Sequence, residues 1–269
     1  MSGPREPRVP ILMYHAVATE PNDATRTLSV TPEAFSEQMA VLSDSGFTPL
    51  DTADLAASWR ASVPLPERPV LITFDDGYEG VHRHALPVLA ELGFPATLFV
   101  STGWLRGEYD TGGGPDTMLD WDQVRALAAA GVEIGGHSHT HPQLDQLDDH
   151  TLRFELRRCR EIITAELGLR PASFAYPYGY SSRRVRRSVR EAGFAQSLAV
   201  GNALARRPQG PYALRRVTVR RSTGIEEFAR VVEGRAITRT FAGDRALTKG
   251  YAMVRRARQL RRKAIRSRV

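Results

Sequence analysis

Residues 70–77 read VLITFDDG, an apolar run of strand length that ends in two aspartates and a glycine. Runs of similar length and composition recur along the chain, and each favours a β-strand. They are VPILMY (9–14), ATLFV (96–100), VEIGG (132–136), SFAY (173–176) and SLAV (197–200). The sequence therefore predicts a strand at each of these places.

Helix signals occupy the segments between these runs. Two predicted helices begin at the capping residues Thr31 and Asp120, a third covers residues 151–167, and all three stop at a glycine. Alternating strands and helices indicate a parallel sheet with crossover helices, in either an open sheet or a closed barrel. Both architectures place their chemistry at the carboxyl ends of the strands, so the polar residues that directly follow the runs are the candidates for a site.

The chain has 269 residues, of which 42% are hydrophobic, and this suffices for the core of one large domain. Its net charge of +7 is unevenly distributed, because residues 246–269 hold nine Lys or Arg and no acidic residue. The first 245 residues therefore carry a net charge of −2. We expect one domain over residues 1–245 and a basic amphipathic helix or tail over residues 246–269.

Composition also excludes several classes of protein. No apolar run approaches the roughly 20 residues that span a bilayer, which excludes an integral membrane protein. The first ten residues, MSGPREPRVP, carry charge and proline where a signal peptide is apolar, so we expect a cytoplasmic protein. A lone cysteine, Cys159, excludes an internal disulfide framework.

The two aspartates that end the first run, Asp75 and Asp76, can take different roles. A turn at Gly77 brings both carboxylates to one site in different orientations. One carboxylate can then bind a metal ion while the other accepts a proton from water. The alternative is a simple Asp-Asp-Gly turn.

The segment GHSHTHP (136–142) follows another run and holds three of the seven histidines in the chain. Imidazoles two or four residues apart can share one face and bind a divalent metal through neutral nitrogens. Spacing alone leaves open whether His139 joins His137 and His141, and a run of surface histidines is the alternative. One aspartate with two histidines would leave open positions for water and substrate, as in a catalytic site.

Two further strand ends carry weaker signals. The turn YPYG (176–179) is either a packed corner or a groove wall that offers a backbone N–H to an oxyanion. His15 closes the first run along the chain, and it is either a satisfied core residue or a catalytic group.

The motifs TFDDG (73–77), HSHTH (137–141) and YPYG (176–179) resemble, in order and separation, those of the NodB-homology polysaccharide deacetylases, carbohydrate esterase family four. The segments ILMYHAV (11–17) and LDWDQVRALAAAGVEIGGH (119–137) are similar to the branch that contains bacterial exopolysaccharide deacetylases of the poly-N-acetylglucosamine type. The resemblance covers residues 9–220 and implies a distorted (β/α) barrel. It also implies metal-dependent hydrolysis of N-acetyl or O-acetyl groups on glycans.

This resemblance assigns roles to the motif residues. Asp75 is the general base, and Asp76, His137 and His141 are the ligands of one divalent metal ion. We expect Zn²⁺, with Co²⁺, Ni²⁺ or Fe²⁺ as alternatives. His139 falls at the variable position of its motif and is left outside the metal shell.

Four more residues complete the expected site. By resemblance, Ser138 braces the histidine loop and Tyr178 supplies a backbone N–H to the oxyanion. Tyr14 and Trp121 are expected to contact the substrate, an acetylated glycan built from units of the N-acetylglucosamine type.

The chain departs from the family pattern at two places. An arginine that orients the base is common in the third motif, where this chain has Ala175. A late histidine normally acts as general acid, but the last histidine here is His150. We expect His15 to be the acid, because it should project onto the same face as Asp75.

Other functions remain open at this point. The two departures favour a glycan-binding pseudoenzyme that keeps the fold and the metal, and a metal-dependent amidohydrolase on a small cyclic amide is a further alternative. For residues 246–269 we expect either a solvated tail or peripheral contact with an anionic membrane at the inner surface, and no specific nucleic acid.

Overall fold

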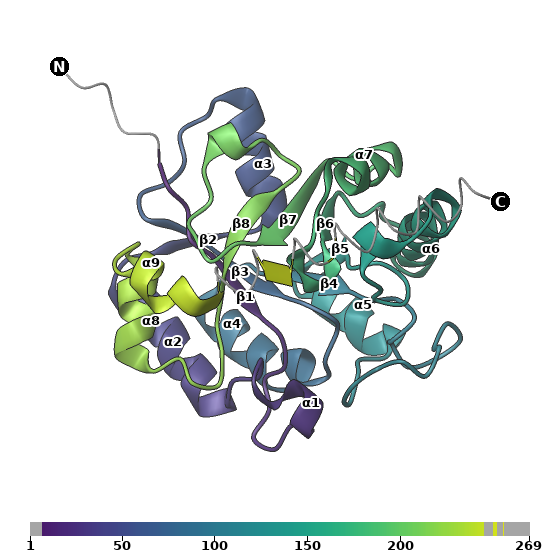
Figure 1. Cartoon of the computed structure of the whole chain (residues 1–269). Coiled ribbons are helices and arrows are strands. Elements are labelled where there is room, and N and C mark those ends of the chain that lie inside the picture. Colours follow the sequence, from purple (N-terminus) through teal and green to yellow (C-terminus); the bar gives the residue numbers. More distant parts are fainter. Residues whose placement is uncertain (1–6, 245–249, 252–254, 256–269) are drawn as a thin grey trace.

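A computed structural model of the chain describes residues 7–244, 250, 251 and 255, and Figure 1 shows their arrangement. Strands and helices alternate along the chain, as the sequence predicts. The strands are β1 (Ile11–Tyr14), β2 (Thr48–Leu50), β3 (Pro69–Phe74), β4 (Thr97–Val100), β5 (Glu133–Gly136), β6 (Ser173–Ala175), β7 (Gln196–Val200) and β8 (Leu214–Thr218).

Helices fill the connections and lie around the strands (Figure 1). The α-helices are α1 (Asp23–Arg26), α2 (Pro32–Asp44), α3 (Thr52–Ala61), α4 (Leu86–Leu92), α5 (Trp121–Ala129), α6 (Asp149–Leu167), α7 (Arg183–Glu191), α8 (Ile225–Val232) and α9 (Ile237–Thr240). One π-helical turn, η1 (Val81–Ala85), precedes α4, and three short 3₁₀ turns are η2 (Leu144–Gln146), η3 (Pro177–Gly179) and η4 (Arg207–Gln209).

All strand pairs are parallel, and the sheet closes on itself. Strand β1 pairs with β8 on one side and with residues Leu71–Phe74 of β3 on the other. Strand β2 pairs with residues Pro69–Leu71 of β3 and stays outside the ring. The result is a distorted barrel of seven parallel strands within the described residues, which decides between the open sheet and the closed barrel.

The six predicted runs all contain strands, and the three predicted helices correspond to α2, α5 and α6. The predicted caps are confirmed, since Thr31 accepts a hydrogen bond from Ala34 N and Asp120 forms a capping box with Gln123. Two strands, β2 and β8, were not predicted, because TPL and LRRVT are not apolar runs.

Side-chain alternation along each strand divides the apolar residues between two sets. Leu71 belongs to a buried cluster with residues of other strands, such as Phe99 and Leu214, which fills the barrel interior. Ile72 belongs to the larger cluster between the barrel and the helices. Residue 75 shares the parity of residue 71, so the strand directs Asp75 toward the barrel axis at its carboxyl end.

The amino end of the barrel is closed by a polar network around Glu133, the first residue of β5. Its carboxylate accepts hydrogen bonds from Thr52 Oγ1 (2.7 Å), Thr97 Oγ1 (3.0 Å) and Ser173 Oγ (2.7 Å). Gln196 also donates to the carbonyl of Thr52, so the start of α3 is attached across four strands. The three motifs end or directly follow β3, β5 and β6, so they lie at the opposite, carboxyl end.

Within the described residues, no helix is both long enough and apolar enough to cross a bilayer. The predicted basic helix or tail over residues 246–269 lies outside the described residues, apart from residues 250, 251 and 255.

Candidate active site

Asp76, His137 and His141 meet at the carboxyl end of the barrel. Asp76 Oδ1 lies 3.2 Å from His137 Nε2 and 3.3 Å from His141 Nε2, and one ligand atom from each residue lies within 4.8 Å of the others. Asp76 follows β3, and both histidines belong to the loop after β5. These three residues form a group of donors that could hold a metal ion.

The tautomer of His137 supports this interpretation. His137 Nδ1 lies 2.8 Å from the carbonyl oxygen of Ala175, which can only accept, so Nδ1 carries the proton. In the neutral ring, the bare Nε2 then faces the Asp76 carboxylate, and two lone pairs oppose each other without a proton between them. Asp76 Oδ1 is buried and has no hydrogen-bond partner. A cation bound by all three atoms would remove this conflict, so the donor set fits a divalent metal.

The pKa shifts of His137 and Asp76 also fit a cation site. Burial lowers the pKa of His137, but the Asp75 and Asp76 carboxylates raise it by more, and the net shift is upward. Burial raises the pKa of Asp76, but His141 and His137 lower it by more, so the carboxyl stays ionised. The site therefore concentrates negative charge where the three ligand atoms meet.

Asp75 is buried beside this group and is held by an arginine. Arg216 Nη1 donates to Asp75 Oδ1 (2.6 Å) and Arg216 Nη2 donates to Asp75 Oδ2 (2.7 Å), a bidentate pair. Asp75 Oδ2 also lies 4.0 Å from His137 Nε2. Burial raises the pKa of Asp75, but the Arg216 guanidinium and His137 together lower it by more, and the carboxyl is ionised at neutral pH.

Sequence reasoning missed Arg216. It treated the arginine as absent because Ala175 stands at its usual place, whereas the structure provides a guanidinium from β8. Arg216 faces inward, and its guanidinium carbon lies 5.6 Å from the centre of the Phe99 ring. A signal was available, because LRRVT reads as a strand with one arginine on each face, and the inward one needs a buried acid.

The histidine loop is braced from two sides. Ser138 Oγ accepts a hydrogen bond from the N–H of His141 (3.1 Å), in line with its expected role. Glu155 of α6 accepts from the N–H groups of His139 (2.9 Å) and Thr140 (2.8 Å), a contact that sequence reasoning missed. His139 does not join the three candidate metal donors, because its Nδ1 lies 2.9 Å from Thr102 Oγ1.

Four motif residues have left-handed backbone conformations although none of them is glycine. They are Asp76 (φ 76°), Ser138 (φ 67°), His141 (φ 57°) and Tyr178 (φ 58°). Such conformations cost on the order of 1 kcal/mol each, and they persist where the surrounding structure imposes them. Here the strain turns side chains and amides of three separate loops toward one point.

Aromatic rings flank His141 on two sides. The Trp104 ring lies 4.3 Å from the imidazole, centre to centre, and the Tyr178 ring lies 4.7 Å from it. Tyr178 is 51% exposed, so its ring forms part of the surface beside the site. Sugar rings bind well against such aromatic faces.

Two residues that were expected to contact substrate are elsewhere. Tyr14 is fully buried, packs against Phe35 and Phe74, and donates its hydroxyl to Gln38. Trp121 is 6% exposed and belongs to the core between the barrel and the helices. The structure does not bring either residue to the site; Trp104 is the tryptophan found there.

His15 lies within the electrostatic reach of the site. It directly follows β1, the strand that pairs with β3 on one side and with β8 on the other. Burial lowers the pKa of His15, while the charges of Asp76 and Asp75 oppose this shift. Its Nδ1 is buried without a hydrogen-bond partner.

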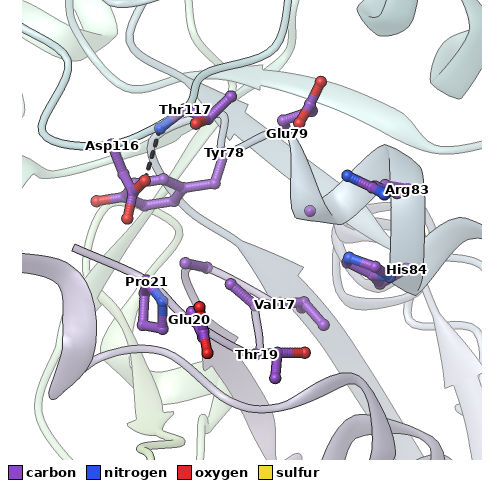
Figure 2. A pocket seen from close by; sticks show the side chains of 13 residues that line it. Val17, Thr19, Glu20, Pro21, Tyr78, Glu79, Arg83, His84, Asp116 and Thr117 are labelled. Carbon is purple, nitrogen blue, oxygen red and sulfur yellow. Dashed lines mark hydrogen bonds between the residues drawn. The ribbon is translucent and has the colours of Figure 1, made fainter.

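A cavity of about 340 Å³ adjoins the site on the side of β1 and β3. Residues 16–21, which follow His15, and residues 78–80, which follow the aspartates, line it together with Asp116 and Thr117. Figure 2 shows the Tyr78 ring beside Asp116, with Val17, Thr19, Glu20 and Pro21 below them. Burial and the charge of Asp76 raise the pKa of Tyr78, so its hydroxyl stays protonated.

Comparison with known proteins supports the resemblance found in the motifs. A family model described as polysaccharide deacetylase matches residues 62–197. The chain is 26% identical to the YxkH protein of Bacillus subtilis (strain 168), over 84% of this chain and 76% of that protein. It is 25% identical to the poly-beta-1,6-N-acetyl-D-glucosamine N-deacetylase of Escherichia coli (strain K12), over 82% of this chain but only 38% of that protein.

Solved structures share the fold. The Streptococcus pyogenes deacetylase PplD, in complex with acetate, aligns with a TM-score of 0.75 at 22% identity, over 84% of this chain and 99% of that one. IcaB from Ammonifex degensii aligns with a TM-score of 0.69 at 23% identity, over 84% of this chain and 97% of that one. These likenesses establish the barrel, and the family match covers half of the chain. The chain therefore belongs to the polysaccharide deacetylase family, of the NodB-homology type.

Proposed function

We propose that this protein is a metal-dependent hydrolase that removes acetyl groups, principally the N-acetyl groups of N-acetylglucosamine-type units, from a polysaccharide or a lipid-linked glycan. One observation carries the proposal: the ionised Asp75 is fixed beside a three-residue metal-binding group in an orientation set by Arg216. The activity in the name of the Escherichia coli relative supports the choice of substrate class.

The metal would be held by Asp76, His137 and His141. One carboxylate and two imidazoles suit Zn²⁺, and Co²⁺, Ni²⁺ or Fe²⁺ also accept this ligand set. A bound divalent cation would polarise the acetyl carbonyl and lower the pKa of a water molecule. With two carboxylates and one guanidinium, the buried groups carry one net negative charge, which favours such a cation.

Asp75 would accept the proton of the attacking water. Its lowered pKa keeps it ionised, and the two hydrogen bonds from Arg216 keep its carboxylate in one orientation. The developing negative charge on the acetyl oxygen would be stabilised by the N–H of Tyr178, which the left-handed turn after Pro177 positions.

An amide nitrogen leaves poorly unless it is protonated, and His15 is the residue that we assign to this step. It directly follows β1, which pairs with β3, the strand before Asp75, and with β8, the strand of Arg216. The absence of a late histidine had favoured a pseudoenzyme, as had the absence of an arginine in the third motif. Arg216 supplies the arginine, so one of these two arguments no longer applies.

The proposed function predicts acetate release from β-linked N-acetylglucosamine oligomers by the purified protein. Release should stop after treatment with a chelator and return on addition of Zn²⁺, Co²⁺ or Ni²⁺, because the three ligands are needed to bind the cation. Enzymatic acetate detection and elemental analysis of the protein would measure both quantities. A protein that binds the oligomers but releases no acetate with any of these metals is a binding module, and the proposal is then wrong.

Replacing the base and a ligand should have separable effects. We expect Asp75→Asn to retain metal and lose roughly 10²- to 10⁴-fold in kcat, since Asn cannot accept the proton but can still accept from Arg216. His137→Ala should lose both metal and turnover. His139→Asn is the matched control in the same loop, and it should keep the metal because His139 contacts Thr102 instead. Equal metal content in all three variants would contradict the ligand assignment.

The role of His15 predicts a dependence on the leaving group. His15→Asn should slow N-acetyl hydrolysis by roughly 10²-fold or more, because the amine needs a proton to leave. Hydrolysis of 4-nitrophenyl acetate should change little, since a phenolate leaves without protonation. Steady-state kinetics on both substrates tests this, and an equal loss on the two would show that His15 is not the acid.

The buried pair also predicts an effect on stability. Arg216→Met should lower the free energy of unfolding by about 3–5 kcal/mol, because it leaves the Asp75 carboxylate buried without its partner. The double variant Asp75→Asn/Arg216→Met should be more stable than Arg216→Met alone. Arg215→Met, the exposed neighbour on β8, is the control and should change the free energy by less than about 0.5 kcal/mol. Denaturant unfolding of metal-free protein measures all of these, and a wild-type midpoint for Arg216→Met would refute the role.

A further inference from the structure

A cavity of about 460 Å³ lies beside the third motif, next to the carboxyl end of β7. Three arginines from separate segments line it: Arg186 of α7, Arg215 of β8 and Arg255. We call these three residues and the cavity the basic pocket. Among the described residues, its lining includes the amide side chains of Asn202 and Gln209 but no Asp or Glu.

The positive charge of the basic pocket is incompletely neutralised within the described part of the chain. Arg186 donates only to Ser181 Oγ (3.1 Å), and Arg215 points out from β8, opposite to Arg216; neither belongs to an ion pair among the described residues. Both guanidinium groups therefore keep donors that an anionic ligand can use.

Arg255 is different, because it is buried. It is 8% exposed, its Nε pairs with Asp145 Oδ2 (2.9 Å), and its guanidinium lies over the Tyr180 ring. Its Nη1 is buried and has no hydrogen-bond partner. A buried donor without an acceptor costs about 1–3 kcal/mol, so an anionic oxygen at this place would be stabilised.

A row of aromatic rings joins the basic pocket to the candidate metal site. The Tyr178 ring lies 4.7 Å from the His141 ring, and the Tyr180 ring stacks on Tyr178 at 6.0 Å with an angle of 20°. Tyr180 lines the basic pocket and carries Arg255 on its face. A glycan that places one acetyl group at the metal site can therefore follow this row and set a neighbouring sugar into the basic pocket.

We propose that the basic pocket binds a carboxylate or phosphate group on a sugar near the acetylated unit, so that the substrate is an acidic polysaccharide. This inference rests on the proposed deacetylase function for the position of the acetylated unit. The recognition chemistry is that of guanidinium groups with anionic oxygens, which form short, charge-assisted hydrogen bonds.

The shape of the pocket favours a glycan over a membrane or a nucleic acid. The lining contains no aliphatic side chain larger than valine, whereas segments that enter a bilayer surface use Leu, Phe or Trp. The pocket also continues the row formed by the Tyr178 and Tyr180 rings. One extended ligand can therefore contact both His141 and Arg255.

The test compares oligosaccharides of equal length. One alternates N-acetylglucosamine with glucuronate, one carries phosphate on a sugar next to N-acetylglucosamine, and one is the neutral N-acetylglucosamine oligomer; inorganic phosphate is a fourth probe. Calorimetry on the full chain gives each Kd. We expect at least one acidic oligosaccharide to bind about tenfold or more tightly than the neutral one, and Arg186→Gln and Arg215→Gln each to remove about tenfold of that preference.

Arg187→Gln is the matched control, because Arg187 is exposed on α7, the helix of Arg186, but does not line the basic pocket. Equal Kd values for acidic and neutral oligosaccharides in the wild-type chain would overturn the inference. An equal loss of the acidic preference in the Arg187→Gln and Arg215→Gln variants would also overturn it, because it would indicate general attraction to a basic surface. Tighter binding to RNA or to anionic vesicles than to every oligosaccharide would overturn it as well.

The binding assay also separates this inference from the proposed function. Acetate release without a preference for acidic oligosaccharides would support the proposed deacetylase function and contradict anion binding by the basic pocket. Binding of acidic oligosaccharides that depends on Arg186 and Arg215, without acetate release from any oligosaccharide, would support anion binding by the basic pocket and contradict the deacetylase function.

Discussion

The buried ion pair between Asp75 and Arg216 is the interaction on which the rest of the site depends. A carboxylate that is 2% exposed needs a partner to stay ionised, and Arg216 provides two hydrogen bonds to it. Asp75 directly follows β3 and Arg216 lies on β8, and each of these strands pairs with β1. The pairing of β1 with both strands, which closes the barrel, therefore brings the two residues together, and it also brings His15 within electrostatic reach of both.

Most of the fold and the three residues of the candidate metal site could be predicted from sequence, because strand runs and histidine spacing are local signals. Arg216 was missed, for two connected reasons. Its strand, LRRVT, carries too much charge to read as a buried run, and its partner lies 141 residues away. Ala175 at the usual arginine position thus suggested a defect, although the same charge reaches the base from another strand. The guanidinium needs only to reach Asp75 in the folded barrel, whereas a sequence motif specifies where along the chain the arginine stands.

Side-chain direction was the second limit of sequence reasoning. Tyr14 and Trp121 are aromatic residues near motifs, yet strand parity and the start of α5 direct both into the core. Trp104 reaches His141 from the loop after β4, where no periodicity predicts an orientation. The left-handed backbone at Asp76, Ser138, His141 and Tyr178 is equally absent from any residue pattern, since none of these residues is a glycine. Bracing contacts such as that of Glu155 impose these conformations from outside the motifs.

Within the described residues, the polar network around Glu133 closes the amino end of the barrel, and the carboxyl end holds the candidate site. Because Thr52, Thr97 and Ser173 satisfy its carboxylate, the network is stable without water passing through it. A ligand at the candidate metal site therefore enters and leaves at the carboxyl end, where the Trp104 and Tyr178 rings flank His141. A polymer can only lie across this end and cannot thread through the protein, so units in the middle of a chain are as accessible as those at its ends.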